Sequence, residues 1–106
     1  SLLESNRHPY VLFMCQQAIE KALKSLIAKA TNEMPPRIHN LTRLSGLVNM
    51  DFSEERLNFF REVSSYYIRS RYPEEFAAFG EGVSAEKAKD VYNKSLEIVT
   101  WLSWKL

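Results

Sequence analysis

The sequence predicts an all-α fold, an antiparallel up-and-down four-helix-type bundle with a short extra helix. The chain of 106 residues contains only three glycines and four prolines, so helix-breaking residues are scarce. No stretch alternates apolar and polar residues as a strand does, whereas apolar residues repeat at helical spacing in several segments. A chain of this length builds a single core, and we therefore expect one domain over residues 1–106.

The first long helix is predicted from Pro9 to about Lys29, because proline is favoured in the first turn of a helix. The stripe expected to face the core consists of Leu12, Cys15, Ile19, Leu23, Leu26 and Ala30. The opposite face carries Gln17, Glu20, Lys21 and Lys24. We expect this face to be solvated, with an ion pair between Glu20 and Lys24. The opening Ser1–Glu4 reads as the end of an earlier helix, so the first helix of the bundle is expected to be truncated.

A loop and a short helix are predicted next. The loop covers residues 32–38, where the consecutive Pro35 and Pro36 disfavour helix. The short helix covers Leu41 to Val48 and has Asn40 as its candidate N-cap.

An aromatic helix is predicted to start after the N-cap Ser53 and to end near Tyr72, because Pro73 disfavours the helical conformation of the residue before it. Its apolar residues, which cover much of its circumference, are Leu57, Phe59, Phe60, Val63, Tyr66, Tyr67 and Ile68. A helix that is apolar on more than one side needs a second burial partner. In so small a domain we expect that partner to be another copy of the chain, in a two-fold homodimer.

The last part of the sequence predicts a connection and a final helix. Residues 74–82 are expected to form a connecting loop with one irregular turn. The final helix is predicted from Ala85 to about Trp104, with Ser84 as its N-cap. The residues expected to face inward are Ala88, Val91, Tyr92, Ser95, Ile98, Val99 and Leu102.

The composition excludes several functional classes. A formal net charge of +1 does not support a strongly basic nucleic-acid binder, so any anion site must be local. The single cysteine, Cys15, is expected to be a small core residue and fits a reducing cytoplasm. No run approaches the roughly 18 apolar residues of a membrane span, so we expect a cytoplasmic protein with no membrane association. His8 and His39 lack the spacing of a zinc or di-iron site, and no metal or cofactor is predicted.

The most informative segment is Tyr67–Pro73, which places two arginines and a tyrosine where a helix must stop. Arginine presents a planar fork of donors that matches phosphate, and tyrosine can stack on a base. Other candidates for such a site are a histidine and an arginine in the loop and two lysines on the first helix. The predicted nucleotide- or phosphate-binding residues are Lys21, Lys24, His39, Arg69, Arg71 and Tyr72.

Structural alternatives exist for these residues. Cations in the last turn of a helix also complement its dipole, and a tyrosine followed by a proline can simply cap it. A histidine just before a helix, such as His39, is often a capping or core-edge residue. Imidazole nevertheless titrates near neutral pH, so His39 beside Arg37 also fits phosphate binding or RNA cleavage as an acid or base.

Three blocks of the sequence, in order, resemble the signatures of the HEPN family, the nucleotide-binding domains of higher eukaryotes and prokaryotes. The blocks are Gln16–Lys24, Pro36–Leu41 and Arg69–Pro73. The resemblance extends over nearly the whole chain, although the last helix matches only in pattern and the usual opening helix is mostly missing. It implies a helical bundle, usually a homodimer, in prokaryotic cytoplasm. It also implies a partner, because small stand-alone members are commonly paired with a minimal nucleotidyltransferase, in some cases as a toxin–antitoxin pair.

Ribonuclease members of the wider family carry an Arg-x4–6-His motif on one helix near the dimer interface. This sequence departs from that motif, because no histidine follows Arg69 or Arg71, and Arg37 precedes His39 in a loop. The preferred hypothesis is therefore a non-catalytic dimeric module that binds nucleotide or polyphosphate and works with a nucleotidyltransferase. One alternative is a metal-independent ribonuclease toxin in which His39 or Tyr72 assists attack by a ribose 2′-hydroxyl. The other is a purely structural dimerisation module.

Overall fold

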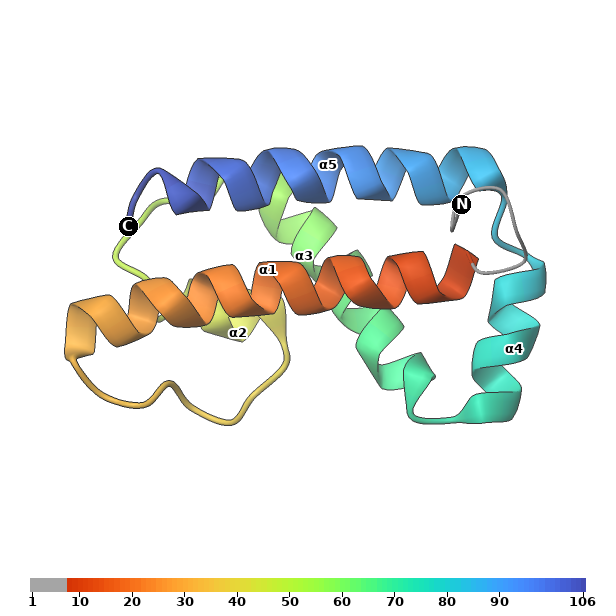
Figure 1. Ribbon diagram of the computed structural model, residues 1–106, viewed down its shortest axis with the longest axis horizontal. Helices are drawn as coiled ribbons and strands as arrows, with labels where there is room; N and C mark the ends of the chain where they lie inside the picture. The colour runs from red at the N-terminus through yellow and green to blue at the C-terminus, as the bar shows by residue number, and fades with distance from the viewer. Residues whose placement is uncertain (1–7) are drawn as a thin grey trace.

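The computed structural model describes residues 8–106 and confirms the predicted all-α fold (Figure 1). Within this range the helices are α1 (His8–Thr31), α2 (Leu41–Ser45), α3 (Glu54–Ser70), α4 (Pro73–Glu81) and α5 (Ala85–Ser103), and there is no strand. The two longest helices, α1 and α5, lie side by side along the long axis, α3 passes behind them, and α4 stands across one end (Figure 1). Because α1 contacts each of the other four helices, it is the central element of the bundle.

The core lies where α1 packs against α2, α3 and α5. Its largest fully buried apolar side chains are Phe60, Leu12, Ile19, Leu23, Leu41, Leu44, Leu102, Val63 and Val91. The apolar stripe predicted for α1 is buried, including Cys15, with the exception of Ala30. Ala30 is exposed because the last turns of α1 extend beyond the end of α5 (Figure 1).

The predicted helix starts are confirmed by their caps. The side chains of Asn40, Ser53 and Ser84 each accept a hydrogen bond from the backbone N–H three residues later, at 3.0 to 3.1 Å. The short helix α2 ends earlier than predicted, at Ser45. Val48 lies beyond it but is still buried in the core, as expected.

The prediction of a connecting loop over residues 74–82 was wrong, because this segment forms most of α4. Pro73 does not only end the preceding helix but also occupies the first turn of the next one, where its fixed φ suits a helix. Glu74 and Glu75 follow in that turn and complement the helix dipole. Phe76 is the buried anchor of α4. Tyr72 is therefore the N-cap residue of α4 and not the last residue of α3.

Tyr92 corrects the expected inner face of α5, because this side chain is 45% exposed. The buried residues of the helix follow three- and four-residue steps through Val91 and Ser95, and Tyr92 is rotated by about 100° from Val91. On α3, Ile68 is 58% exposed, so the apolar circumference of this helix is not fully buried within the chain. The homodimer inferred from that circumference stays a prediction.

The first turns of α1 pack closely against α4. A Cβ atom added to Gly80 would lie 2.2 Å from Cγ of Pro9, so only glycine permits this approach. Beside this contact, the rings of Tyr10 and Phe76 meet edge to face, with centroids 5.6 Å apart. Within residues 8–106 no helix is long and apolar enough to cross a membrane. The truncated helix predicted from Ser1–Glu4 falls outside the described residues.

Candidate functional site

A buried carboxylate organises the middle of α1. Glu20 is only 7% exposed, so the prediction of a solvated face was wrong at this position. Its Oε2 accepts a hydrogen bond from Nζ of Lys24 at 3.0 Å, which confirms the predicted ion pair, and its Oε1 accepts one from Nε2 of Gln16 at 2.9 Å. Burial by itself would raise the pKa of Glu20, but the hydrogen bonds from Gln16, His39 and Lys24 outweigh it and lower the pKa. Glu20 is therefore an anion at neutral pH.

Gln16 joins α1 to the loop that precedes α2. Its side chain is fully buried. Besides Glu20, its Nε2 donates to the carbonyl oxygen of His39, also at 2.9 Å. Its Oε1 accepts a hydrogen bond from Nε2 of Gln17 at 2.6 Å, so the network assigns the orientation of the amide. The backbone of the loop is thereby held against α1 at His39.

The imidazole of His39 lies between Glu20 and the aromatic ring of Tyr67. Nδ1 of His39 is 2.9 Å from Oε1 of Glu20. The ring stacks on Tyr67 with centroids 4.2 Å apart and an interplanar angle of 24°. Because the carboxylate can only accept, Nδ1 carries a proton, and Nε2 holds a lone pair whenever the ring is neutral. The side chain is 41% exposed, so ligands can reach it.

Tyr67 connects His39 to the end of α3. Its hydroxyl accepts a hydrogen bond from Nη1 of Arg71 at 3.1 Å, and the guanidinium carbon of Arg71 lies 5.9 Å from the centre of the tyrosine ring. On the inner side, Phe13 of α1 packs against the same ring, with centroids 6.1 Å apart. Tyr67 thus fixes both an imidazole and a guanidinium on one surface.

The structure brings together Lys24, His39 and Arg71 among the predicted site residues, through Glu20 and Tyr67. We call these five residues the cation cluster. It draws on three elements that are distant in the chain: α1, the loop before α2, and the end of α3.

The other predicted site residues lie elsewhere. The guanidinium carbon of Arg69 lies 4.3 Å from the centre of the Phe79 ring. Residues two positions apart in a helix are rotated by about 200° around its axis, so the side chains of Arg69 and Arg71 point in different directions. Tyr72 is 56% exposed at the start of α4, and Lys21 is exposed on α1. Among the described residues no hydrogen bond or ion pair links either side chain to the cation cluster.

Sequence reasoning did not assign Gln16, Glu20 or Tyr67 to the site. The first two lie at i and i+4 with Lys24 following at i+8, a spacing that marks one face of a helix but does not say whether that face is covered. Tyr67 was predicted only as an apolar residue of the aromatic helix. Its stacking partner, His39, is far away in sequence, and no local pattern predicts such a pair.

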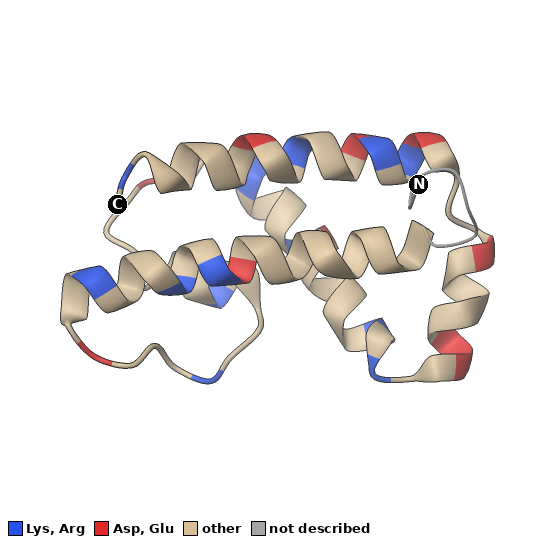
Figure 2. Cartoon of the chain, in the orientation of Figure 1, with Lys and Arg blue, Asp and Glu red and all other residues tan. Residues whose placement is uncertain are grey.

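Charge is distributed unevenly over the bundle (Figure 2). Lysines and arginines occur on the second half of α1, on α2 and the loop before it, along α3 and at its end, and along α5. The first half of α1, residues 8–19, carries no Lys, Arg, Asp or Glu. In the described part of the chain, no group of three or more His, Cys, Asp and Glu side chains is placed to hold a metal ion.

Comparison with known families agrees with the sequence blocks that form this site. The family model described as the HEPN domain matches residues 1–105. No curated protein and no solved structure matched the chain significantly. Each of the three blocks that resemble the family contributes to the cation cluster. Gln16–Lys24 supplies the carboxylate and the lysine, Pro36–Leu41 supplies the histidine, and Arg69–Pro73 supplies the arginine.

Proposed function

Because the chain belongs to the HEPN domain family, we propose that it is a homodimeric, cytoplasmic module that binds nucleotide or polyphosphate and acts with a partner minimal nucleotidyltransferase. In a toxin–antitoxin setting, the two proteins would form the pair. The observation that carries the proposal is the cation cluster, in which Lys24 and the imidazole of His39 pair with one ionised carboxylate and Arg71 joins them through Tyr67.

The cluster has the chemistry of a phosphate site. Arg71 offers the planar fork that pairs with two phosphate oxygens, and Lys24 adds a point charge. His39 can donate to phosphate only when Nε2 is protonated, because its Nδ1–H is already directed at Glu20. In that state the cluster carries three positive groups against one carboxylate, so bound phosphate compensates an excess of positive charge.

A thermal-shift titration with ATP, GTP and a short RNA tests the proposal, with Arg69→Ala as the matched control for Arg71→Ala. A ligand that binds only the folded state at about 100 times its Kd adds about 2.7 kcal/mol to stability, which raises the melting temperature. We expect the nucleotide-dependent rise to disappear in Arg71→Ala and to persist in Arg69→Ala, whose guanidinium lies over Phe79 instead. An unchanged rise in Arg71→Ala would show that the site is misassigned.

The partner and the dimer are tested separately. Analytical ultracentrifugation of the protein is expected to give a dimer, in line with the exposed Ile68 on α3. A nucleotidyltransferase reading frame is expected beside the gene, and its product should co-purify with this chain when both are expressed together. A stable monomer, or a nucleotidyltransferase that does not associate, would contradict the corresponding part of the proposal.

A second candidate function is a metal-independent ribonuclease, and the pair formed by Glu20 and His39 favours it. A carboxylate on Nδ1 leaves the Nε2 lone pair of a neutral imidazole ready to accept a proton, as a general base requires. Attack by a ribose 2′-hydroxyl next to Arg71 would use this base. The expected result is RNA cleavage in the presence of a chelator that is lost in His39→Ala, with Tyr72→Phe testing the tyrosine. Cleavage that persists in both variants would exclude these roles.

A further inference from the structure

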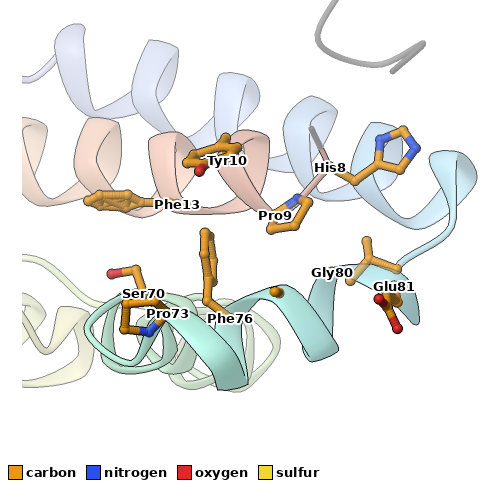
Figure 3. Close-up of a pocket in the computed structure, with 11 residues that line it drawn as sticks. His8, Pro9, Tyr10, Phe13, Ser70, Pro73, Phe76, Gly80 and Glu81 are labelled. Carbon is orange, nitrogen blue, oxygen red and sulfur yellow. The ribbon is translucent and has the colours of Figure 1, made fainter. Parts of the chain in front are cut away.

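A cavity of about 910 Å³, lined by apolar and polar side chains that include His8 and Glu81, lies between the first half of α1 and α4 (Figure 3). Three aromatic side chains, Tyr10, Phe13 and Phe76, are among the residues that line it. In Figure 3 the Phe76 ring extends from α4 toward α1, where Tyr10 and Phe13 lie. Phe76 is buried, whereas Tyr10 is 58% exposed, so one aromatic wall is accessible from solvent. The volume is within the range of small-molecule sites, about 300 to 1,000 Å³.

One end of this cavity adjoins the cation cluster. Phe13, which lines the cavity, packs against Tyr67, whose ring stacks on His39 and whose hydroxyl binds Arg71. Ser70 also lines the cavity and directly precedes Arg71 in the chain. An aromatic space and a set of cations are thus joined through a single tyrosine.

We propose that the cavity receives the base and ribose of a nucleoside 5′-triphosphate whose phosphates lie on Lys24, His39 and Arg71. This inference rests on the proposed phosphate site and names the class of ligand that the site takes. The nucleobase is the planar part of that ligand, and aromatic walls stack on any base. Residues 8–19 of α1 carry no charge, so a neutral base entering beside this helix displaces no ion pair of that segment. Inorganic polyphosphate would satisfy the cations but leave the cavity unused.

The lining also predicts the selectivity. Ser70 lies at the end of the cavity next to the cation cluster, and its hydroxyl already donates to the carbonyl oxygen of Tyr67, whereas His8 and Glu81 line the opposite end (Figure 3). Directional recognition of one base is therefore weak at this end, and stacking area dominates. Purine triphosphates are expected to bind more tightly than pyrimidine triphosphates, with little difference between ATP and GTP.

Isothermal titration calorimetry of the full chain with ATP and with inorganic tripolyphosphate tests the inference. ATP is expected to bind about tenfold more tightly, the effect of stacking one base on an aromatic side chain. Tyr10→Ala removes the exposed aromatic wall and should bring the affinity for ATP close to that for tripolyphosphate, without changing the latter. Tyr92→Ala, which removes an exposed tyrosine on α5, is the matched control and should leave both affinities unchanged. Ala77→Trp, which fills the cavity from α4, should reproduce the effect of Tyr10→Ala.

The two proposals fail in different ways. If tripolyphosphate and ATP bind equally to the unaltered protein and Arg71→Ala abolishes both, the phosphate site stands and the base cavity is overturned. A loss of ATP and tripolyphosphate binding to the same extent in Tyr10→Ala also overturns the cavity. If neither ligand binds the unaltered protein, the phosphate site and the cavity are overturned together.

Discussion

The two halves of α1 differ in how they hold their neighbours. Residues 8–19 carry no charge and meet α4 through apolar and aromatic contacts, including Pro9 against Gly80 (Figures 2 and 3). From Glu20 onward the helix carries charged side chains, and the Glu20 carboxylate binds the imidazole of His39 in the loop before α2, beside the bond from Gln16 to the backbone of that loop. The first contact depends on shape and the second on complete pairing of polar groups. Substitutions should therefore disrupt the two halves by different mechanisms.

Loss of the carboxylate should have the largest effect. Glu20→Ala removes one of the two acceptors of the Gln16 amide and the acceptor of the His39 imidazole, and we expect about 3 kcal/mol of destabilisation together with loss of nucleotide binding. Urea unfolding and an ATP titration measure these two effects.

The matched control is Glu62→Ala. Glu62 also accepts hydrogen bonds, from Tyr66 and Lys87, but its side chain is 37% exposed. We expect this control to cost about 1 kcal/mol and to leave nucleotide binding intact. Equal losses would remove the distinction between the two carboxylates.

The second largest loss of stability is expected from a methyl group added where residues 8–19 of α1 meet α4. Gly80→Ala would place Cβ 2.2 Å from Cγ of Pro9, and separating α4 from α1 should cost about 2 kcal/mol. In Gly82→Ala the nearest atom, the carbonyl oxygen of Phe79, is 3.6 Å away, so this control should be tolerated. Thermal unfolding of the two variants gives the comparison. Equal melting temperatures would mean that α4 does not depend on this close contact.

A smaller effect is expected from pH. Burial raises the pKa of Glu20 and Glu62, but the donors around each carboxylate outweigh burial and leave both pKa values lowered. Below the ordinary pKa of about 4.3 the unfolded state binds protons more readily, so stability present at neutral pH is lost as the pH falls through the folded values. Urea midpoints measured from about pH 6 to about pH 3 should decline, and Glu20→Gln should flatten part of that decline. An unaltered slope in Glu20→Gln would contradict the lowered pKa.

The smallest stability effect is expected at two lysines of the polar half. Lys24 pairs with Glu20, whereas Lys21 is exposed and outside the cation cluster. Lys21→Ala should change stability by less than about 0.5 kcal/mol and leave ATP affinity unchanged. Lys24→Ala should weaken ATP binding by about tenfold, the loss expected for one charge-assisted contact. If both variants weaken binding alike, the phosphate site extends to Lys21.

The sequence predicted the fold more fully than the site. Helix caps are local, so Asn40, Ser53 and Ser84 were identified from residue type alone. A proline can follow the end of one helix or occupy the first turn of the next. The helix α4 was missed because only the first role was considered for Pro73. The burial of Glu20 depends on a loop that returns from 19 residues away, which helical spacing does not encode.

Within the site, the separation of Arg69 from Arg71 follows from helical rotation and was available from the sequence. The stacking of His39 on Tyr67 was not, because it depends on how the loop before α2 folds over the end of α3. Such contacts are decided by the packing of three elements together and not by any one of them.

Nitrogen-15 NMR of the histidine rings tests most directly whether Glu20 holds Nδ1 of His39 so that Nε2 meets phosphate beside Lys24 and Arg71. The chain has two histidines, so a His8→Gln variant assigns the signals. We expect the neutral ring of His39 to carry its proton on Nδ1, and the Nε2 signal to respond to added tripolyphosphate. In Glu20→Ala, which removes the acceptor of Nδ1, both features should be lost. A neutral His39 protonated on Nε2, or an imidazole that does not respond to saturating tripolyphosphate, would contradict this arrangement.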